Sequence, residues 1–532
     1  MNESVQQVYL REDVYFEPLL RNWYAWPYLL PPVCTALNFM GRNLRLMKSF
    51  VNNHRIHIAA RSQPGLAGGD FVDCSEEQVE DVRRLVEDIE SHDVYRRIRD
   101  AVAELNELLA KETGHSLERL YEQVPEVLRG YVELVYDGGH NATFRLIEGL
   151  IYESPLYDES IQSISLGMLE RVERRPFVLS SPRFPDQNHL HLDVPLSSPS
   201  LDELFAARTR PVSMDRMRKL FADCQQQGGV GFDELFTATP PQRGYEPLQS
   251  SLRIRFTGHA GLLLETPHVA IMVDPVIASV DKRYVETDIV SFAQLPDRID
   301  YVCLTHTHMD HVCVETLIQL RHKIGCVLVP KNSGGNLFDP SVKLMLQKIG
   351  LIVREFEDME TLRLDDGYIR AIPFLGEHAD LNIRSKTAWY FELAGKKIFS
   401  GADSASVDAI MYERIHRLIG KLDLLFIGME CVGAPLSWMY GPLFIKPIPR
   451  AINESRRLNG SDFDSARKLV EIFAPNEVYI YALGMEPWFR YFMGLDYHEN
   501  SRQVQESERL LAFCAERGLH AERLVGSRRW EL

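Results

Sequence analysis

Three histidines and an aspartate are concentrated in the sequence HTHMDH, which follows an apolar run at residues 301–304. The run predicts a buried strand, and the residues after the motif predict a helix. Where a strand ends, residues two apart share a face, so His306 and His308 can bind one metal ion. Asp310 and His311 come from the adjoining turn and can face a second metal. The alternative is a solvated histidine cluster, but the fixed backbone at the end of a buried strand favours a two-metal site.

The surrounding sequence predicts elements that could hold such a motif in place. Short strand-like runs separated by Gly and Pro open the C-terminal half, at 254–256, 262–264 and 270–273. Strands and helices then alternate, with helices predicted at 407–419 and 465–473. Strands first and strand–helix alternation afterwards indicate a layered α/β architecture.

The HxHxDH pattern resembles the metallo-β-lactamase superfamily, and the resemblance runs from about Ser251 to the C-terminus. The sequences FTGHAGLLLE and MVDPV resemble the opening strands of that fold, and FSGADSA resembles its second acidic motif. The resemblance implies a metallo-β-lactamase αββα sandwich in which Asp403 bridges two metals. A carboxylate suits this role, because its two oxygens can hold two neighbouring cations.

A third motif, FLGEH, offers two adjacent ligands. Superfamily hydrolases place a histidine near this point, and binding through His378 would give a histidine-rich site of the zinc hydrolase type. Binding through Glu377 would combine His306 and His308 with carboxylates. Redox-active iron prefers that set, because anionic oxygens stabilise the ferric state. The residues alone leave both alternatives open.

The superfamily usually supplies a last histidine at the end of a late strand, here near residues 481–486, and this segment has none. The candidate substitutes are His498, Glu486 and Glu430. The missing neutral ligand distinguishes the site from a standard dizinc hydrolase.

A closer resemblance covers the whole chain. The sequences LTHTHMDH, FLGEH, FSGADSAS and GMECVGAPLSW resemble the diiron β-hydroxylase family associated with nonribosomal peptide synthetases, whose type member acts in chloramphenicol biosynthesis. The resemblance implies a dinuclear iron cluster that uses O2 to hydroxylate the β-carbon of an aromatic amino acid. That amino acid, p-aminophenylalanine, is held as a thioester on a carrier domain. The family's glutamate ligand falls on Glu377.

The resemblances together predict a non-heme diiron monooxygenase. The predicted metal ligands are His306, His308, Asp310, His311, Glu377 and Asp403. Glu377 and Asp403 are also the predicted catalytic residues. The alternative is a zinc-dependent hydrolase of the same fold, such as a phosphodiesterase, lactonase or thioesterase, in which the metals generate hydroxide. No dinucleotide or flavin fingerprint stands out, so an external electron donor is expected.

The chain is predicted to divide into two domains. Residues 1–245 form a mainly helical N-terminal domain, and residues 246–532 form the catalytic domain with the dinuclear site. The Gly- and Pro-containing segment 225–250 is predicted to be a linker. The N-terminal domain carries no evident chemistry, which predicts a role in forming a homodimer or in docking the carrier.

Two local features of the N-terminal domain make specific predictions. Ser75, followed by acidic residues and by apolar residues at helical spacing, is a predicted helix N-cap. His189 and His191 alternate in NHLHLDV, as two residues on one face of a strand would. Surface or hydrogen-bonded histidines are favoured there over a metal pair.

Composition excludes several classes of partner. The 532 residues include 75 acidic and 59 basic side chains, for a formal net charge of −16, which argues against nucleic acid. The eight cysteines form no CxxC pair, which is typical of reduced residues in a cytoplasmic protein. The sequence shows no signal peptide and no unbroken apolar stretch that would cross a membrane.

Overall fold

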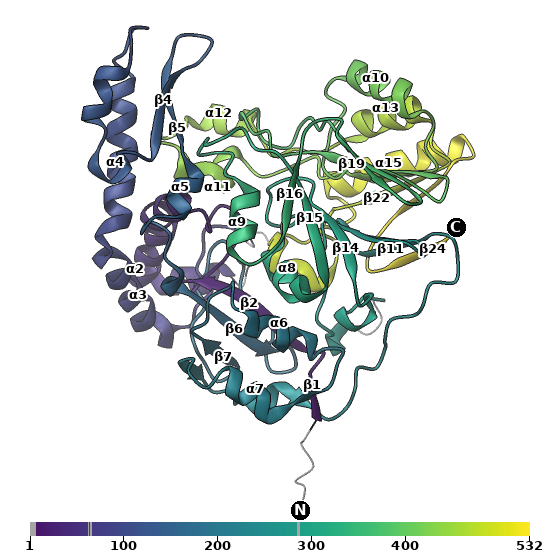
Figure 1. The fold of residues 1–532 in the computed structure, drawn as a ribbon, viewed down its shortest axis with the longest axis horizontal. Helices are drawn as coiled ribbons and strands as arrows, with labels where there is room; N and C mark the ends of the chain where they lie inside the picture. Colours follow the sequence, from purple (N-terminus) through teal and green to yellow (C-terminus); the bar gives the residue numbers. More distant parts are fainter. Residues whose placement is uncertain (1–6, 62, 64–65, 67, 285–287) are drawn as a thin grey trace, which may run out of the picture.

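The computed structural model describes residues 7–532 except 62, 64–65, 67 and 285–287. Its C-terminal half contains two seven-stranded sheets, coloured teal to yellow in Figure 1. In the first sheet, the strands from β13 to β16 pair in parallel and the others are antiparallel. Its strands in spatial order are β16 (Val353–Phe356), β15 (Ile324–Pro330), β14 (Ile299–Cys303), β13 (Ala270–Val273), β12 (Gly261–Glu265), β11 (Arg253–Gly258) and β24 (Arg528–Glu531).

The second sheet faces the first across a shared apolar core. Phe256 and Ile271 of the first sheet pack with Trp389 and Phe426 of the second. Burial of both inner faces explains why these strands are rich in aromatic and β-branched residues. The strands in spatial order are β17 (Thr361–Leu364), β18 (Gly367–Ile372), β19 (Ala388–Leu393), β20 (Lys396–Ser400), β21 (Leu424–Gly428), β22 (Glu477–Tyr481) and β23 (His520–Arg523).

Helices cover the outer face of each sheet. On the first sheet, apolar residues of α8 (Val314–Leu320) and α9 (Val342–Lys348) join a core with residues of β14 and β15. On the second sheet, α10 (Ala409–Ile419), α13 (Phe463–Phe473) and α15 (Arg502–Glu516) bury one apolar stripe each. The layers are therefore αββα, and the predicted metallo-β-lactamase architecture is confirmed. Short helices in the connecting segments are α11 (Leu436–Tyr440), α12 (Arg450–Ser455) and α14 (Arg490–Met493).

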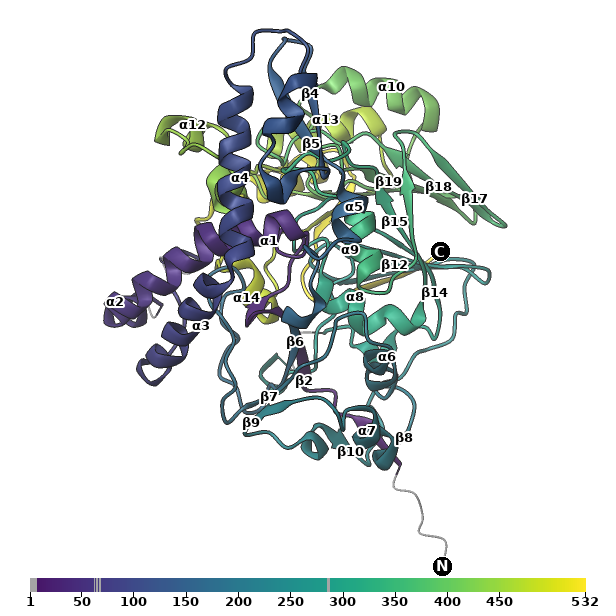
Figure 2. The ribbon, with the colours of Figure 1, turned by 60° about the vertical axis from the view of Figure 1, so that its left-hand side comes forward.

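The N-terminal part contains more helix than strand, and its longest helices lie along the left-hand side of Figure 1 and come forward in Figure 2. In α3, the residues Val82, Leu85, Val86 and Ile89 are buried, as the spacing predicts, and Ser75 forms a capping box with Gln78 just before it. The helices are α1 (Pro32–Asn38), α2 (Leu44–Arg61), α3 (Val79–Ser91), α4 (Asp93–Leu109), α5 (Glu148–Tyr152), α6 (Pro199–Ala206) and α7 (Met214–Leu220).

The N-terminal part also contains sheets that the sequence analysis did not predict. The largest is antiparallel and has the order β3-β2-β6-β7-β9. Its strands are β2 (Val14–Leu20), β3 (Trp23–Tyr24), β6 (Gln162–Met168), β7 (His189–Leu192) and β9 (Gln226–Gly228). The smaller sheets consist of β1 (Gln7–Leu10), β8 (Val212–Ser213) and β10 (Phe236–Thr237), and of β4 (Val132–Tyr136) with β5 (Ala142–Leu146).

The predicted linker at 225–250 is wrong in its first half. That half forms β9 and β10 and buries Phe232, Leu235 and Phe236. These apolar anchors outweigh the turn-forming glycines beside them. The connection to the catalytic half is the shorter segment 238–252, which enters β11.

The N-terminal and C-terminal parts share one hydrophobic core rather than meeting at a thin interface. A buried charge network crosses the boundary: the Arg175 guanidinium bonds Glu17 at 2.9 Å and Glu315, on α8, at 2.7 Å. Burial alone would raise the pKa of Glu17, but the adjacent Arg183 and Arg175 lower it to about 2. Unpaired charges would be costly at this depth, so the network fixes the N-terminal part against α8.

No helix in the part of the chain that the structure describes is long and apolar enough to span a bilayer.

Candidate metal centre

The motif at 306–311 occupies the loop between the carboxyl end of β14 and α8. Asp274, directly after the neighbouring parallel strand β13, fixes this loop through its side chain. Its Oδ1 accepts from the Thr305 amide at 2.8 Å and its Oδ2 accepts from the Thr305 hydroxyl at 2.5 Å. The ends of adjacent parallel strands meet at one edge of the sheet, which is why MVDPV and the histidine motif meet in space.

All six predicted ligands converge at this edge. Within each of three overlapping groups, the candidate ligand atoms lie within 4.8 Å of one another. The first group, called here the first metal position, is His306, His308 and Glu377. The group at the opposite end, called here the second metal position, is His259, Asp310 and His311. The third group joins them and consists of His306, His311 and Asp403.

The donor atoms of these groups fit a pair of metal ions. Glu377 Oε1 lies 2.9 Å from His308 Nδ1, and Asp403 Oδ2 lies 2.9 Å from His311 Nε2. His306 Nε2, Glu377 Oε2 and Asp403 Oδ1 are buried without a hydrogen-bond partner in the described part of the chain. Buried polar atoms without partners are costly, and coordinated cations would satisfy them.

The charges of the site point the same way. Burial raises the pKa of the Glu377 carboxyl well above its usual range, and repulsion from Asp403 and Asp310 raises it further. Burial lowers the pKa of His306 well below its usual range, with repulsion from His311 and His308 added. Both pKa shifts arise because carboxylates and imidazoles are buried close together. Bound cations would stabilise the ionised carboxylates and the neutral imidazoles.

Glu377, rather than His378, points into the first metal position. It follows Gly376 in a turn where both residues have positive φ, +94° and +67°, and its amide bonds the Asn459 carbonyl at 3.1 Å. His378 is also buried, and its Nε2 has no described partner, but it belongs to none of the three groups. Its Nδ1 lies 2.9 Å from the Tyr440 hydroxyl. The geometry therefore favours Glu377 as the ligand.

None of the three candidate substitutes for the missing last histidine joins a metal group among the described residues. His498 is exposed. Glu430 accepts hydrogen bonds from Tyr497 and from Gln503. Glu486 accepts one from the His259 amide at 2.7 Å. The residue that does join is His259, which the sequence analysis missed although it stands in the FTGHAG landmark.

Further side chains orient the ligands from outside. The His311 Nδ1–H group donates to Asp274 Oδ2 at 2.8 Å, which leaves Nε2 free to face a metal. Tyr440, on α11, places its hydroxyl 3.0 Å from His308 Nε2. The N-terminal part reaches this layer through Tyr28, whose hydroxyl lies 3.0 Å from Thr307 Oγ1.

The prediction of hydrogen-bonded histidines at residues 189 and 191 is confirmed for His189. Its Nδ1 lies 2.6 Å from Asp186 Oδ1, and Nε2 contacts the Tyr15 hydroxyl. Among the described residues, neither histidine belongs to a metal-binding group.

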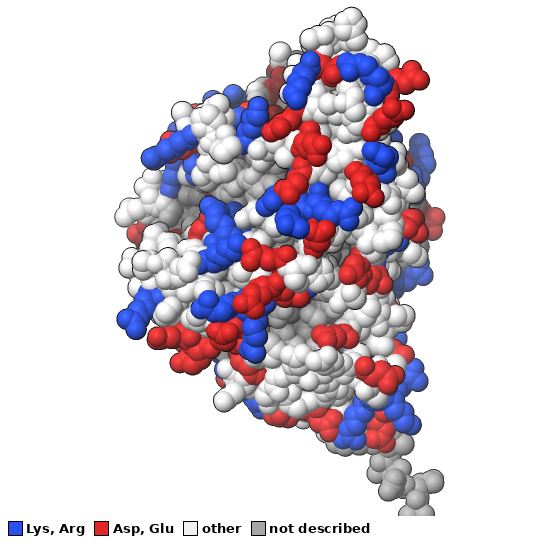
Figure 3. Space-filling view, turned by 90° about the vertical axis from the view of Figure 1, so that its left-hand side faces the viewer, with Lys and Arg blue, Asp and Glu red and all other residues white. Residues whose placement is uncertain are grey.

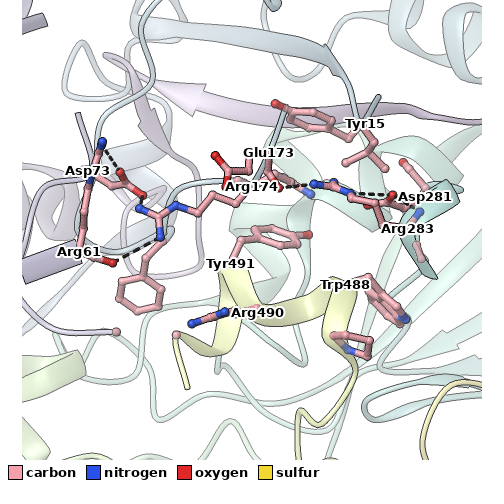
Figure 4. Close-up of a pocket in the computed structure, with 18 of the residues that line it drawn as sticks. Tyr15, Arg61, Asp73, Glu173, Arg174, Asp281, Arg283, Trp488, Arg490 and Tyr491 are labelled. Atoms are coloured by element: carbon pink, nitrogen blue, oxygen red, sulfur yellow. Dashed lines mark hydrogen bonds and ion pairs between the residues drawn. The ribbon is translucent and has the colours of Figure 1, made fainter. Parts of the chain in front are cut away.

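A cleft of about 390 Å³ lies between the N-terminal part and the segment 487–494. Tyr15 and Tyr491 line opposite sides of it (Figure 4), and the Arg175 guanidinium lies 4.6 Å and 3.5 Å from their ring centroids. Trp488 also lines the cleft and packs directly on the backbone of Gly258. Trp488 therefore connects the lining of the cleft to the turn that carries His259.

Comparisons with known proteins agree with this geometry. A model of the diiron non-heme beta-hydroxylase N-terminal domain matches residues 9–240, and a beta-lactamase superfamily domain model matches residues 270–439. The chain is 36% identical over 529 residues to the 4-amino-L-phenylalanyl-CmlP-peptidyl-carrier-protein 3-hydroxylase of Streptomyces venezuelae. That match covers 97% of this chain and 98% of the relative.

Two solved structures match over nearly the full length. The crystal structure of CmlA, a diiron beta-hydroxylase from Streptomyces venezuelae, aligns with a TM-score of 0.90 and 34% identity, over 99% of this chain and 100% of that one. A glutamate-to-aspartate variant of CmlA aligns with a TM-score of 0.87 and 33% identity, with the same coverage. The matches support a metal pair of iron and do not support the zinc hydrolase alternative. The chain belongs to the family of diiron non-heme β-hydroxylases.

Proposed function

We propose that this enzyme hydroxylates the β-carbon of p-aminophenylalanine while the amino acid is held as a thioester on a carrier domain of a nonribosomal peptide synthetase, in chloramphenicol-type biosynthesis. The printed name of its 36% identical relative specifies a 4-amino-L-phenylalanyl group on a peptidyl carrier protein. The observation that carries the proposal is the position of Glu377 beside His306 and His308. A carboxylate in place of a further histidine suits redox-active iron rather than hydrolytic zinc.

The six predicted ligands would divide between two irons. His306, His308 and Glu377 would hold one, Asp310 and His311 would hold the other, and Asp403 would contact both. Bound irons supply the activation of O2, the co-substrate, and the oxidation of the C–H bond. One oxygen atom enters that bond, and the other leaves as water with two electrons and two protons from an external donor. Glu377 and Asp403 would act as the catalytic carboxylates, because they would contact the reacting metals.

The protein's own contribution is orientation and exclusion of water. Five of the six ligands are at least 94% buried, which keeps bulk water away from the reacting centre. Asp274 holds His311 with Nε2 facing inward, and the Tyr440 hydroxyl holds His308 with Nδ1 facing Glu377. These contacts keep the ligand set in place before a substrate arrives.

Metal analysis tests the choice between iron and zinc. Protein purified without added metal should contain close to two irons per chain and little zinc. The diferric form should absorb in the near-ultraviolet and visible, since zinc is colourless and an oxo-bridged ferric pair absorbs strongly. A colourless protein with two zincs and hydrolase activity would overturn the proposal.

Turnover tests the carrier-bound substrate. The thioester on a carrier domain and the free amino acid should be offered at equal concentration with O2 and a chemical reductant. We expect β-hydroxylation of the thioester only, with one water formed per product. Equal turnover of the free amino acid would refute tethering while leaving the diiron assignment intact.

The N-terminal part, residues 1–245, supports partner or subunit contact. Exposed apolar side chains, Ile56, Ile147 and Leu150, lie on or next to its helices. On the side seen in Figure 3, basic and acidic side chains are interspersed, so contact there would not depend on a patch of one sign. We expect a homodimer by light scattering. Charge reversal on this face should weaken dimerisation or carrier binding without removing iron.

A further inference from the structure

His259 is held by its backbone in a conformation that side chains rarely adopt. It occupies the turn between β11 and β12 with φ at +50°, where L-residues are strained. Its amide donates to Glu486 Oε1 at 2.7 Å, and its carbonyl accepts from the Ala482 amide at 2.8 Å. Both partners follow β22 in the second sheet. The segment 482–486 is where the superfamily usually has a histidine ligand. In this protein it instead holds His259 of the first sheet through these two hydrogen bonds.

The clamp places the imidazole against Asp310. His259 Nε2 lies 3.1 Å from Asp310 Oδ2, and the ring packs on those of Phe489 and His311, with centroids 5.0 and 5.4 Å away. Among the described residues, no other side chain is within hydrogen-bonding distance of the Asp310 carboxylate. Asp310 is also the most exposed ligand, with 19% of its side chain accessible, so it has the greatest need of an orienting partner.

The two ring nitrogens of His259 are not equivalent. Nδ1 is buried without a partner in the described part of the chain, so a proton there would have no acceptor. A proton on Nε2 has the Asp310 carboxylate as acceptor. The tautomer with Nε2–H is therefore favoured, and it donates to Asp310.

We propose that His259 is a positioning residue for the second metal position, where its Nε2–H group holds the Asp310 carboxylate in the orientation that binds metal beside His311. The inference rests on the proposed ligand set. Each ligand of this position would then have a hydrogen-bonding partner that orients it: Asp274 orients His311, and His259 orients Asp310. Partners of this kind fix ligand geometry, and their loss typically weakens metal binding about 10- to 100-fold.

Substitution by glycine separates the imidazole from the backbone clamp. Glycine adopts positive φ without strain, so His259→Gly should fold with unchanged circular dichroism. We expect one of the two irons to bind about 10- to 100-fold more weakly in chelator competition. In the Mössbauer spectrum of the diferric form, one quadrupole doublet should shift while the other stays. The matched control is His140→Gly, an exposed histidine with φ at +61°, which should keep both irons and both doublets.

A second substitution distinguishes positioning from ligation. The side-chain amide of His259→Gln can reach the place of Nε2 and donate to Asp310, so this variant should recover most of the iron affinity and the original spectrum. Unchanged iron affinity and spectrum in His259→Gly would overturn the inference. So would equal losses in both variants, with one fewer coordinated imidazole nitrogen by pulsed EPR of the mixed-valent form. That pattern would make His259 a ligand.

The variant Asp310→Ala separates this inference from the proposed function. It should lose the same iron that His259→Gly weakens. If Asp310→Ala kept both irons, the ligand set would be wrong, and the inference would fail with it. If Asp310→Ala lost that iron while His259→Gly did not weaken it, the inference alone would fail.

Discussion

The two metal positions differ in how they are enclosed. In the first, His306, His308 and Glu377 are at most 6% exposed, and Tyr440 closes over them with Tyr28 of the N-terminal part behind it. In the second, the Asp310 side chain is 19% exposed, and its carboxylate lies 3.1 Å from His259 Nε2. Burial therefore contributes more to the first position, and orienting contacts contribute more to the second.

The largest effect should come from the ligand that belongs to both positions. Asp403→Ala should empty both, because the bridging carboxylate is lost, and hydroxylation should fall by about 10³-fold or more, the scale of a metal contribution of several kcal/mol. Iron per chain and product formation are the measurements. Asp365→Ala, at an exposed turn, is the control. Two irons and full activity in Asp403→Ala would show that the positions share no bridge.

Glu377→Ala should affect the first position alone. We expect loss of about one iron, a changed optical spectrum and a drop in activity of about 10²-fold or more, since a buried first-position ligand is removed. His378→Ala, at the neighbouring residue, should change activity about tenfold at most, because His378 packs on His308 and bonds Tyr440 but offers no ligand atom to the metal groups. The reverse order of effects would return the site to the hydrolase pattern.

Asp274→Asn should weaken the second position while keeping every ligand. Asn tolerates the positive φ of +37° at this residue, but it no longer offers a carboxylate to His311 Nδ1–H. Iron at the second position should bind about 10- to 100-fold more weakly in chelator competition. Equal weakening of both irons would mean that Asp274 acts on the whole loop through Thr305 rather than on one position.

The smallest effect should come from Tyr440→Phe. It removes one hydroxyl from beside His308 and His378, a loss of about 0.5–1.5 kcal/mol, or about 2- to 13-fold in affinity at the first position. Tyr152→Phe removes a buried hydroxyl on α5 of the N-terminal part, outside the metal groups, and serves as the control. A large loss in Tyr440→Phe would show that the first position also depends on orienting contacts, which would remove the contrast between the two.

Much of the catalytic half could be predicted because its signals are local. The apolar run at 301–304 corresponds to β14, and the predicted helix at 465–473 lies within α13. The choice between Glu377 and His378 could not be predicted in this way. Which of the two side chains points inward depends on the positive φ values of the turn, and the residue types do not reveal these values. His259 was missed because its role depends on a clamp from Ala482 and Glu486, which are more than 200 residues away in the chain.

The N-terminal sheet was missed for another reason. Its strand β2, VYFEPLL, is buried along its whole length and pairs on both sides, so it shows no alternation of polar and apolar residues. It also contains Pro18, which removes one backbone donor and argues against a central strand. The helical stripes of α3 and α4 were visible because one face of each helix is exposed.

Because the buried Arg175 needs acidic partners from both halves of the chain, the two halves can be exchanged between relatives only together. Its positive charge is balanced by Glu17 from one half and Glu315 from the other. A recombinant could join the N-terminal half of one relative to the catalytic half of another. It would then need matching charged residues at these three positions, since an unpaired buried charge would destabilise the fold by about 3–5 kcal/mol. Exchange of whole enzymes between biosynthetic clusters is therefore easier than exchange of their halves, and designed chimaeras should place their crossover outside this network.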